Sequence, residues 1–364
     1  MSTYFDTAWL SLKDTLGDQS IPLQSLDLPL FRPFDVSVSV LRTDLLCLPV
    51  ETGFHVDGLN GNKLFKLLPN LFHALQQGKD HFLTFGGVWS NHLHATALAC
   101  SSFNLKSIGL IRGERTRLLS DTLVDCVHAG MNLYFLPRSY YRELQHCKTE
   151  SKLLRSLFGG LLDTAHIVPS GGSNTLGVLG AAYLGNQVAR ELLDAECQVD
   201  SVWMPTATGG TVLGIASGML AGVDNAYKRR TVLPEFTIKG VSVLANKNLP
   251  NEISQMQSRL LLSGDALIDA DVFSQAVQLI DGSLGGYAST TSEYLTFLND
   301  LERQLPFAID HVYIGKLFYK LWTDLQQAYI PNGQHIVLIH TGGQQGRRGL
   351  DEIPVTNNAR ADSC

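Results

Sequence analysis

The sequence predicts an α/β protein whose parallel sheets are covered by helices on both faces. Short apolar runs bounded by turn residues alternate along the chain with stretches of helical periodicity. Because such alternation places a helix between successive strands, it favours parallel pairing. The strands are expected at 38–40, 82–85, 108–111, 133–136, 167–169, 202–205, 236–243 and 336–340, and the longest helices at 64–75, 176–193 and 317–328.

Length and composition restrict the class of protein. A chain of 364 residues with 45% hydrophobic residues can bury a large core and suggests two domains. A net charge of −6 gives no basic field for nucleic acid or anionic membranes. With no secretory signal at the start and no apolar stretch of membrane-spanning length, a soluble, cytoplasmic protein is expected. The six cysteines form no CxxC pair, which supports neither a zinc site nor a disulfide framework.

Loops at the carboxyl ends of the strands are the candidates for chemistry, because sites in α/β sheets form there. Lys63 follows a Gly-Asn turn and opens the helix at 64–75, without an adjacent acid. Since a helix N-terminus disfavours positive charge, the pKa of Lys63 should be lowered, which suits a nucleophilic lysine. Alone, the motif is better explained as a helix start with exposed cations.

The loop Phe85–His94 lies between a strand and an alanine-rich helix. Its glycine pair and free N–H groups can bind a carboxylate or a phosphate, although Ser90 or Asn91 can also be a simple helix N-cap. His92 and His94 have no third metal ligand at suitable spacing, so no metal is expected.

The turn Thr208–Thr211 joins another strand to a helix. Its backbone N–H groups, threonine hydroxyls and helix dipole can hold a single phosphate. The spacing fits neither a dinucleotide loop nor a nucleoside triphosphate loop. Further along, Tyr313 precedes a glycine at a helix start and Thr341 ends the last apolar strand; alone, neither indicates a function.

Six motifs occur together in one order. They are Gly-Asn-Lys-x-x-Lys from Gly61, Ser-Asn-His from Ser90, Gly-Gly-Ser-Asn from Gly171, Thr-Gly-Gly-Thr from Thr208, Val-Tyr-x-Gly-Lys from Val312 and His-Thr-Gly-Gly from His340. The set resembles the D-cysteine desulfhydrase and 1-aminocyclopropane-1-carboxylate (ACC) deaminase family. These are pyridoxal 5'-phosphate (PLP) enzymes of the tryptophan synthase β-subunit type, fold type II. The resemblance extends from about Arg42 to Gly343.

The resemblance implies how PLP is held. Lys63 would be the Schiff-base lysine, Asn91 would hydrogen-bond the phenolic oxygen of the cofactor, and Thr341 would face the pyridine nitrogen. A neutral hydroxyl there would weaken the electron sink, which suits loss of a good β-leaving group. The cofactor phosphate would be bound by Ala207, Thr208, Gly209, Gly210 and Thr211.

The resemblance also implies the substrate site and the domains. Ser90, Asn91 and His92 would hold the substrate carboxylate, and Tyr313 would transfer a proton or act as nucleophile, with Tyr287 close by. Lys63, Tyr313 and Ser90 are thus the predicted catalytic residues. A smaller α/β domain, residues 67–169, would be inserted into a larger PLP-binding domain made of 1–66 and 170–364.

Three positions depart from the family pattern. Phe65 replaces a usual arginine and Trp89 a usual glutamine, and both are expected to shift the substrate toward a larger or more apolar side chain. Ile314 stands where true ACC deaminases typically carry a glutamate near the pyridine nitrogen, which predicts poor opening of the ACC ring.

The predicted function is a PLP-dependent lyase or deaminase that releases ammonia and a 2-oxo acid from a small amino acid, with D-cysteine the first substrate to test. ACC deamination and an inactive PLP-binding homologue are the alternatives within the family. Outside it, the chain could be an α/β protein that binds a phosphorylated metabolite at Thr208–Thr211. A homodimer is expected.

Overall fold

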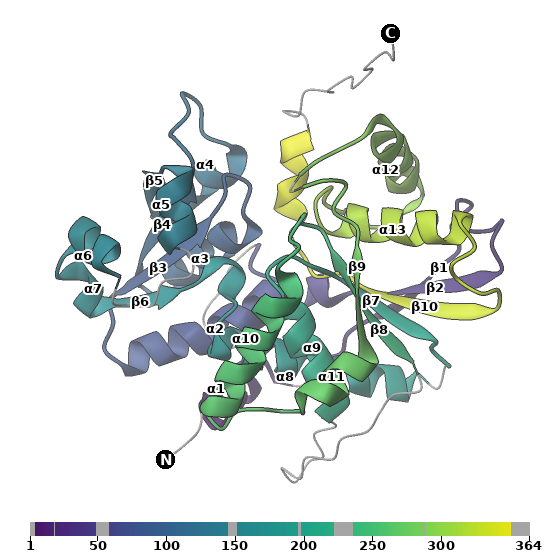
Figure 1. Ribbon diagram of the computed structural model, residues 1–364, viewed down its shortest axis with the longest axis horizontal. Helices are drawn as coiled ribbons and strands as arrows, with labels where there is room; N and C mark the ends of the chain where they lie inside the picture. Colours follow the sequence, from purple (N-terminus) through teal and green to yellow (C-terminus); the bar gives the residue numbers. More distant parts are fainter. Residues whose placement is uncertain are drawn as a thin grey trace.

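Two parallel-stranded sheets lie side by side in two lobes of the computed structural model (Figure 1). The model describes residues 4–17, 19–48, 58–144, 151–195, 198–221, 236–286 and 288–350. The larger sheet has the strand order β1-β2-β10-β7-β8-β9 and the smaller one the order β5-β4-β3-β6. The predicted α/β class, with helices on the faces of its sheets, is confirmed.

The smaller sheet is wholly parallel. Its strands are β3 (His81–Gly86), β4 (Lys106–Arg112), β5 (Asn132–Leu136) and β6 (Ala165–Val168). The helices of this lobe are α3 (Asn91–Ser102), α4 (Asp121–His128), α5 (Arg138–Leu144), α6 (Lys152–Phe158) and α7 (Leu161–Thr164). Because the strands run the same way, the loops before α3 and α5 emerge at one edge of the sheet.

The larger sheet contains β1 (Leu23–Leu26), β2 (Val36–Leu41), β7 (Ser201–Thr206), β8 (Thr237–Ser242), β9 (Val277–Asp281) and β10 (Gln334–Ile339). Every predicted strand is present. The short strands β1 and β9 were not predicted, because four or five partly exposed residues carry little periodic signal. β1 pairs antiparallel with β2, so the prediction of parallel sheets is wrong at this one edge.

The remaining helices pack around the larger sheet or against one another. They are α1 (Tyr4–Leu16), α2 (Gly61–Gln76), α8 (Thr175–Asp194), α9 (Gly210–Ala221), α10 (Leu249–Leu262), α11 (Ala270–Ala276), α12 (Ser292–Gln304) and α13 (Ile314–Gln326), with the 3-10 segments η1 (Thr43–Leu45), η3 (Ser170–Gly172) and η4 (Gln344–Leu350). Of these, α2 also contacts β6 of the smaller sheet. No helix of the described ranges is long and apolar enough to cross a membrane. The predicted domain boundaries stay a prediction; residue 67 lies inside α2.

Glycines allow three helices to pack with almost no space between their backbones. A Cβ at Gly218 of α9 would lie 1.9 Å from the carbonyl oxygen of Ala182 in α8. A Cβ at Gly180 of α8 would lie 1.9 Å from the carbonyl oxygen of Phe65 in α2. Because α2 and α9 both pack closely against α8, their N-terminal ends lie next to each other between the lobes.

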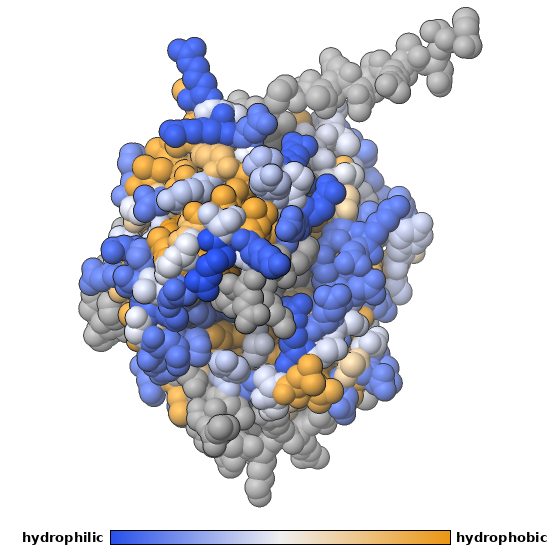
Figure 2. Space-filling view, turned by 60° about the vertical axis from the view of Figure 1, so that its left-hand side comes forward, coloured by the Kyte–Doolittle hydropathy of each residue, from blue (hydrophilic) through white to orange (hydrophobic). Residues whose placement is uncertain are grey.

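Figure 2 turns the left-hand side of Figure 1, with the smaller lobe, toward the viewer. Hydrophilic residues cover most of this face, and hydrophobic residues gather mainly toward its upper left. The smaller lobe exposes several large apolar side chains, namely Leu118, Val127, Tyr134, Tyr140 and Leu157. Exposed apolar surface of this kind is where a partner can bind. The expected homodimer stays a prediction.

We predict that Gly218→Ala destabilises the protein by at least about 1–3 kcal/mol, because the added methyl group has no space beside the Ala182 carbonyl. The measurement is urea unfolding followed by circular dichroism. Gly160→Ala is the matched control: Gly160 has a φ of −67°, and its Cβ would meet only an Asp163 oxygen, at 3.9 Å. Equal stability of the two variants would show that α8 and α9 can separate at no cost.

Candidate active site

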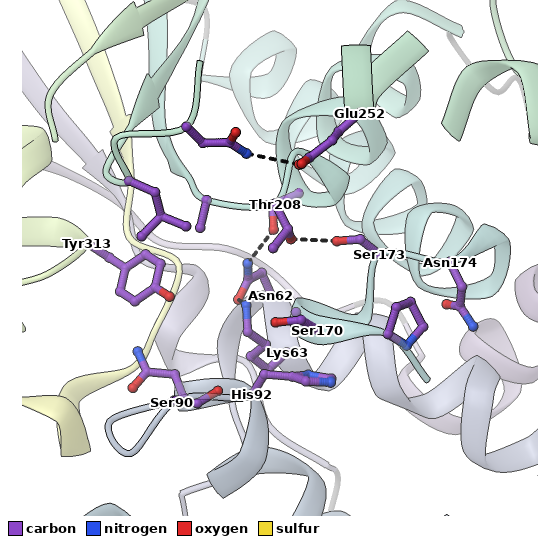
Figure 3. A pocket seen from close by; sticks show the side chains of 18 of the residues that line it. Asn62, Lys63, Ser90, His92, Ser170, Ser173, Asn174, Thr208, Glu252 and Tyr313 are labelled. Atoms are coloured by element: carbon purple, nitrogen blue, oxygen red, sulfur yellow. Dashed lines mark hydrogen bonds between the residues drawn. The ribbon is translucent and has the colours of Figure 1, made fainter. Parts of the chain in front are cut away.

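A cavity of about 1070 Å³ lies between the lobes, at the carboxyl ends of strands from both sheets. It brings together most of the residues singled out from the sequence: Lys63, Ser90, Asn91, His92, Ala207, Thr208, Thr211, Tyr313 and Thr341. Figure 3 shows Lys63 near its centre, with Thr208 and Ser173 on one side and Ser90 and His92 on the other. Gly209 and Gly210 belong to the same turn but do not line the cavity. Tyr287 lies outside the described residues.

The start of α2 is packed against the end of β10. Gly61 has a φ of +59°, and a Cβ there would lie 2.5 Å from the carbonyl oxygen of Thr341. The backbone N–H of Asn62 donates to the same oxygen at 3.3 Å. Only glycine fits this left-handed, crowded position, so the Gly-Asn-Lys motif fixes Lys63 next to Thr341.

Lys63 is the reactive candidate of the cavity. Burial lowers its pKa to about 8, and the carboxylate of Asp310 partly opposes this shift. The lowered pKa expected from the helix start is therefore present, with burial as its main cause. Nζ donates to Oδ1 of Asn62 at 3.4 Å, and the amide of Asn62 donates to Oγ1 of Thr211 at 2.9 Å. Asn62 thus connects the lysine to the proposed phosphate turn.

Lys66, one helical turn further along α2, is buried more deeply than Lys63. Only 1% of its surface is exposed, and burial together with the charge of Lys63 lowers its pKa well below the ordinary value. A Cβ at Gly210 would lie 2.9 Å from Nζ of Lys66 and 2.7 Å from Oγ of Ser173. An amine buried at this depth keeps its charge only when an anion lies nearby, and the turn before α9 is where such an anion can bind.

The turn before α9 is held in place by the loop that carries the Gly-Gly-Ser-Asn motif. Oγ of Ser173 and Oγ1 of Thr208 are 2.6 Å apart and share a hydrogen bond. Gly209 has a φ of +81°, which directs the chain into the first turn of α9. Backbone N–H groups, two hydroxyls and the ammonium of Lys66 converge here. The residues present therefore fit the phosphate of PLP, and Lys63 would be the lysine that bonds to its carbonyl group.

The loop before α3 carries the proposed carboxylate site. Ser90 is the N-cap of α3, its Oγ accepting from the N–H of Leu93 at 3.3 Å, so the simple structural role also holds. Nε2 of His92 is 2.9 Å from Oγ1 of Thr84, which itself donates to a backbone carbonyl, so His92 carries its proton on Nε2. Burial lowers the pKa of His92 well below its usual value, which keeps the ring neutral.

Asn91 links this loop to the C-terminal segment. Its Oδ1 accepts from Nε2 of Gln345 at 3.0 Å, so η4 of the larger lobe contacts α3 of the smaller one. His94 bonds Asp125 at 3.2 Å, and Asp125 also pairs with Arg348 of η4. Across the described ranges, no three His, Cys, Asp or Glu side chains are grouped as metal ligands.

A buried carboxylate holds Tyr313 in place. Both oxygens of Asp310 accept backbone N–H groups at the start of α13, from Val312 at 2.9 Å, Tyr313 at 2.8 Å and Ile314 at 3.0 Å. Burial nevertheless raises the pKa of Asp310 to about 6. Figure 3 shows the Tyr313 ring reaching into the cavity from the side opposite Ser173. Tyr313 thus lines the cavity where a bound molecule would lie.

Lys316 holds another wall of the cavity. Its ammonium is fully buried and donates to the backbone carbonyls of Val243 at 3.3 Å, Ser283 at 2.8 Å and Gly286 at 2.7 Å. Gly286 lines the cavity. The lysine of the Val-Tyr-x-Gly-Lys motif is therefore a positioning residue that ties the loop after β9 to α13.

The three departures from the family pattern do not reach the cavity. Phe65 is buried in the core and stacks with Tyr183 of α8 at 6.4 Å between ring centroids. Ile314 is buried among the apolar residues beneath α13, and Trp89 is not one of the lining residues. The expectation that Phe65 reshapes the substrate site is wrong, because its side chain lies in the core. The expectation for Trp89, the neighbour of the lining residue Ser90, stays a prediction.

Several residues of the site were not predicted. Lys66, Asn62, Ser173 and Asp310 received no role, although Lys66 and Ser173 lie in motifs that were noted. The signal that could have found Lys66 is its position three residues after Lys63. The two lysines share the first turn of α2 and lie beside each other on the helix surface. Asp310 carried no such signal.

The fold and this arrangement of lysines around a phosphate turn define the class: a PLP enzyme fold of the tryptophan synthase β-subunit type. The structure of threonine deaminase isoform 2 from Solanum lycopersicum superimposes with a TM-score of 0.58 at 14% identity, over 96% of this chain and 86% of that one. At this identity the likeness concerns the fold alone. No family model matches the chain.

Closer relatives fall in the family that the six motifs resemble. The chain is 27% identical over 359 residues to the mitochondrial bifunctional D-cysteine desulfhydrase/ACC deaminase of Arabidopsis thaliana, covering 94% of this chain and 82% of that protein. A crystal structure described as an ACC deaminase homologue superimposes with a TM-score of 0.69 at 25% identity, over 95% of this chain and 98% of the other. The predicted resemblance is thus confirmed along nearly the whole chain.

We predict that borohydride treatment of the PLP-loaded protein leaves a pyridoxyl mass on the peptide of Lys63.

Uptake of PLP by the cofactor-free protein should accelerate as pH rises through about 8, because the uncharged amine is the nucleophile and predominates above its pKa. Peptide mass spectrometry and stopped-flow absorbance are the measurements. A label on Lys66 or Lys316, or a midpoint near that of an ordinary lysine, would contradict the assignment.

Proposed function

We propose that the protein is a PLP-dependent lyase that eliminates the β-substituent of a small amino acid, with D-cysteine as the model substrate. The observation that carries this proposal is the pair of buried lysines on the first turn of α2. Lys63 faces the cavity, whereas Lys66 lies against the phosphate turn. Lys63 would bond to the carbonyl group of PLP, and Lys66 would bind its phosphate. These are the two groups through which PLP is bound.

The lowered pKa of Lys63 gives the site its base. With a pKa of about 8, about a tenth of these side chains are uncharged at pH 7, against fewer than about one in a thousand for an ordinary lysine. When bound, PLP withdraws electrons from the α-carbon of the substrate and makes its proton acidic. Nζ of Lys63 accepts that proton. In the overall reaction, D-cysteine and water give hydrogen sulfide, ammonia and a 2-oxo acid.

The first turn of α3 and Tyr313 act on the substrate. The N–H groups that open a helix have no partner within it, so those after Ser90 can bind the substrate carboxylate. The Tyr313 hydroxyl moves a proton between its oxygen and the substrate, and Asp310 keeps its backbone in position. Asn91 and Thr341 border the cavity where they can contact the cofactor ring.

Loss of a sulfur substituent suits this cavity better than opening of the ACC ring. Ring opening has no good leaving group, so it needs strong charge stabilisation and well-placed acids. Among the described lining residues the only carboxylate is Glu252, and its Oε2 accepts from Nδ2 of Asn246 at 3.0 Å. At the position of the deaminase glutamate, Ile314 lies in the core.

The setting of the enzyme is part of the proposal. We place it in the cytoplasm as a homodimer that acts on a free small amino acid, without nucleic acid or membrane partners. The acidic net charge supports the absence of an anionic polymer as partner. The exposed apolar side chains of the smaller lobe are available to a second copy.

We expect kcat/KM for D-cysteine to exceed that for ACC, measured as 2-oxo acid release on one preparation. A broader screen of D- and L-amino acids controls for a different sulfur substrate. Faster turnover of ACC would contradict the leaving-group argument. A yellow protein that turns over no amino acid would make the chain an inactive PLP-binding homologue, and a protein without bound PLP would favour another phosphorylated ligand.

Tyr313→Phe should lower kcat by about a hundredfold or more while leaving the PLP absorption band in place, because the proposed role of the hydroxyl is to transfer a proton and not to hold the cofactor. Turnover and the visible spectrum are measured on the same sample. Thr208→Ala is the matched comparison, since it should weaken PLP retention first. Unchanged turnover in Tyr313→Phe would reduce Tyr313 to a packing role.

A further inference from the structure

The cavity is larger than a small amino acid requires. Cavities of about 300–1,000 Å³ enclose most of a drug-sized ligand, and PLP carrying an amino acid is of that size. At about 1070 Å³, the cavity lies just above this range, so it has room for a substrate larger than cysteine. Its outer part, where the lining residues are exposed, is its mouth.

Three arginines from three different elements line that mouth. They are Arg112 at the end of β4, Arg142 on α5 and Arg259 on α10, and all three are exposed. Two come from the smaller lobe and one from the larger. A molecule in the cavity would therefore meet positive charge from both sides of the cleft.

The smaller lobe places its two arginines beside the proposed carboxylate loop. In the sheet, Ile111 of β4 is paired with Gly86 of β3, so Arg112 emerges next to the glycine pair that leads to Ser90. Tyr141, which precedes Arg142, is buried and bonds the side chain of Ser170, and it lies close enough to Arg112 for the charge of that arginine to affect its pKa. Tyr141 thus anchors this part of the rim.

Arg259 belongs to the opposite wall. Met256, one turn earlier on α10, packs over Gly209, where a Cβ would lie 3.1 Å from its terminal methyl group. Arg259 continues the same helix face outward. The phosphate turn lies on the other side of Met256 and has its own cation, Lys66. The arginine rim is therefore a second positive region, separate from the one that holds the cofactor phosphate.

The three rim arginines have no carboxylate partner within the described part of the chain. Six other described arginines do, in the pairs Arg32–Asp27, Arg42–Asp44, Arg155–Asp163, Arg303–Asp300, Arg347–Glu302 and Arg348–Asp125, whereas the exposed Arg115, Arg117 and Arg138 do not. The only described acid among the lining residues is Glu252, which lies in the first turn of α10, seven residues before Arg259. Its carboxylate accepts a hydrogen bond from Asn246. The rim thus carries an excess of positive charge.

We infer that the substrate of this enzyme is an amino acid whose side chain ends in a second anionic group, which Arg112, Arg142 and Arg259 bind at the cavity mouth. The inference rests on the proposed function, since it assumes an amino acid held at Lys63. Planar guanidinium groups bind carboxylates and phosphates through paired hydrogen bonds, and a cleft with low-dielectric walls focuses their field. The anion can be a carboxylate or a phosphate.

A pair of substrates that differ in one charge tests this inference. S-carboxymethyl-cysteine and S-carbamoylmethyl-cysteine have the same β-sulfur and nearly the same shape, but only the first carries a distal carboxylate. Both are assayed as D- and L-forms with the PLP-loaded enzyme, and O-phosphoserine serves as the distal-phosphate arm. We expect kcat/KM to favour the charged member by about tenfold or more and the preference to fall with added salt.

Arginine variants locate the effect. The ratio of the two kcat/KM values should approach one in the triple variant Arg112→Gln, Arg142→Gln, Arg259→Gln. Arg303→Gln, an exposed arginine of α12 outside the cavity, should keep the wild-type ratio. Because both substrates are compared on one preparation, the ratio does not depend on how much of a variant folds.

The outcomes separate the two proposals. A wild-type ratio near one, with cysteine derivatives still turned over, would overturn the distal-anion inference and leave the lyase standing. If no sulfur amino acid is turned over, the proposed function fails, and calorimetric titration of the same pair into the PLP-loaded protein decides the inference alone. Equal affinity for the two compounds would then overturn it, as would a preference that persists in the triple variant.

Discussion

Two ammonium groups, three residues apart on the first turn of α2, are held inside the protein. Both the desolvation of a cation and the positive end of the helix dipole oppose such an arrangement. The two lysines differ in their surroundings. Lys63 keeps contact with the cavity and has a pKa of about 8, whereas Lys66 is enclosed against the turn that begins α9. A bound phosphate would compensate the second charge and leave the first lysine free to react.

This constraint depends on close packing between helices. Without the glycine contacts at Gly180 and Gly218, α2 and α9 could not both lie against α8, and the lysines could not approach the phosphate turn. The stability of the larger lobe and the geometry of the site therefore have a common origin. The smaller lobe is joined to this frame through η4, where Gln345 bonds Asn91 and Arg348 pairs with Asp125.

The inner and outer parts of the cavity have different tasks. The floor, formed by α2, the turn before α9 and the start of α13, contains the two lysines, the turn and the tyrosine that would act on PLP and the substrate. The rim comes from β4, α5 and α10, and its residues can vary without disturbing the floor. Substitutions at the floor motifs, such as Phe65 and Ile314, face the core instead. Selection among substrates is thus expected at the rim.

The sequence alone determined the class of fold, the order of the strands along the chain and the motif that places Lys63, because periodicity, turn residues and helix starts are local properties. Only the tertiary structure decided which distant residues meet. Lys66 acquires its role from Gly210 and Ser173, more than a hundred residues away, and the direction in which Phe65 points depends on α8. The short strands β1 and β9 exist through their pairing with neighbours, since four or five residues contain too little pattern to specify a strand.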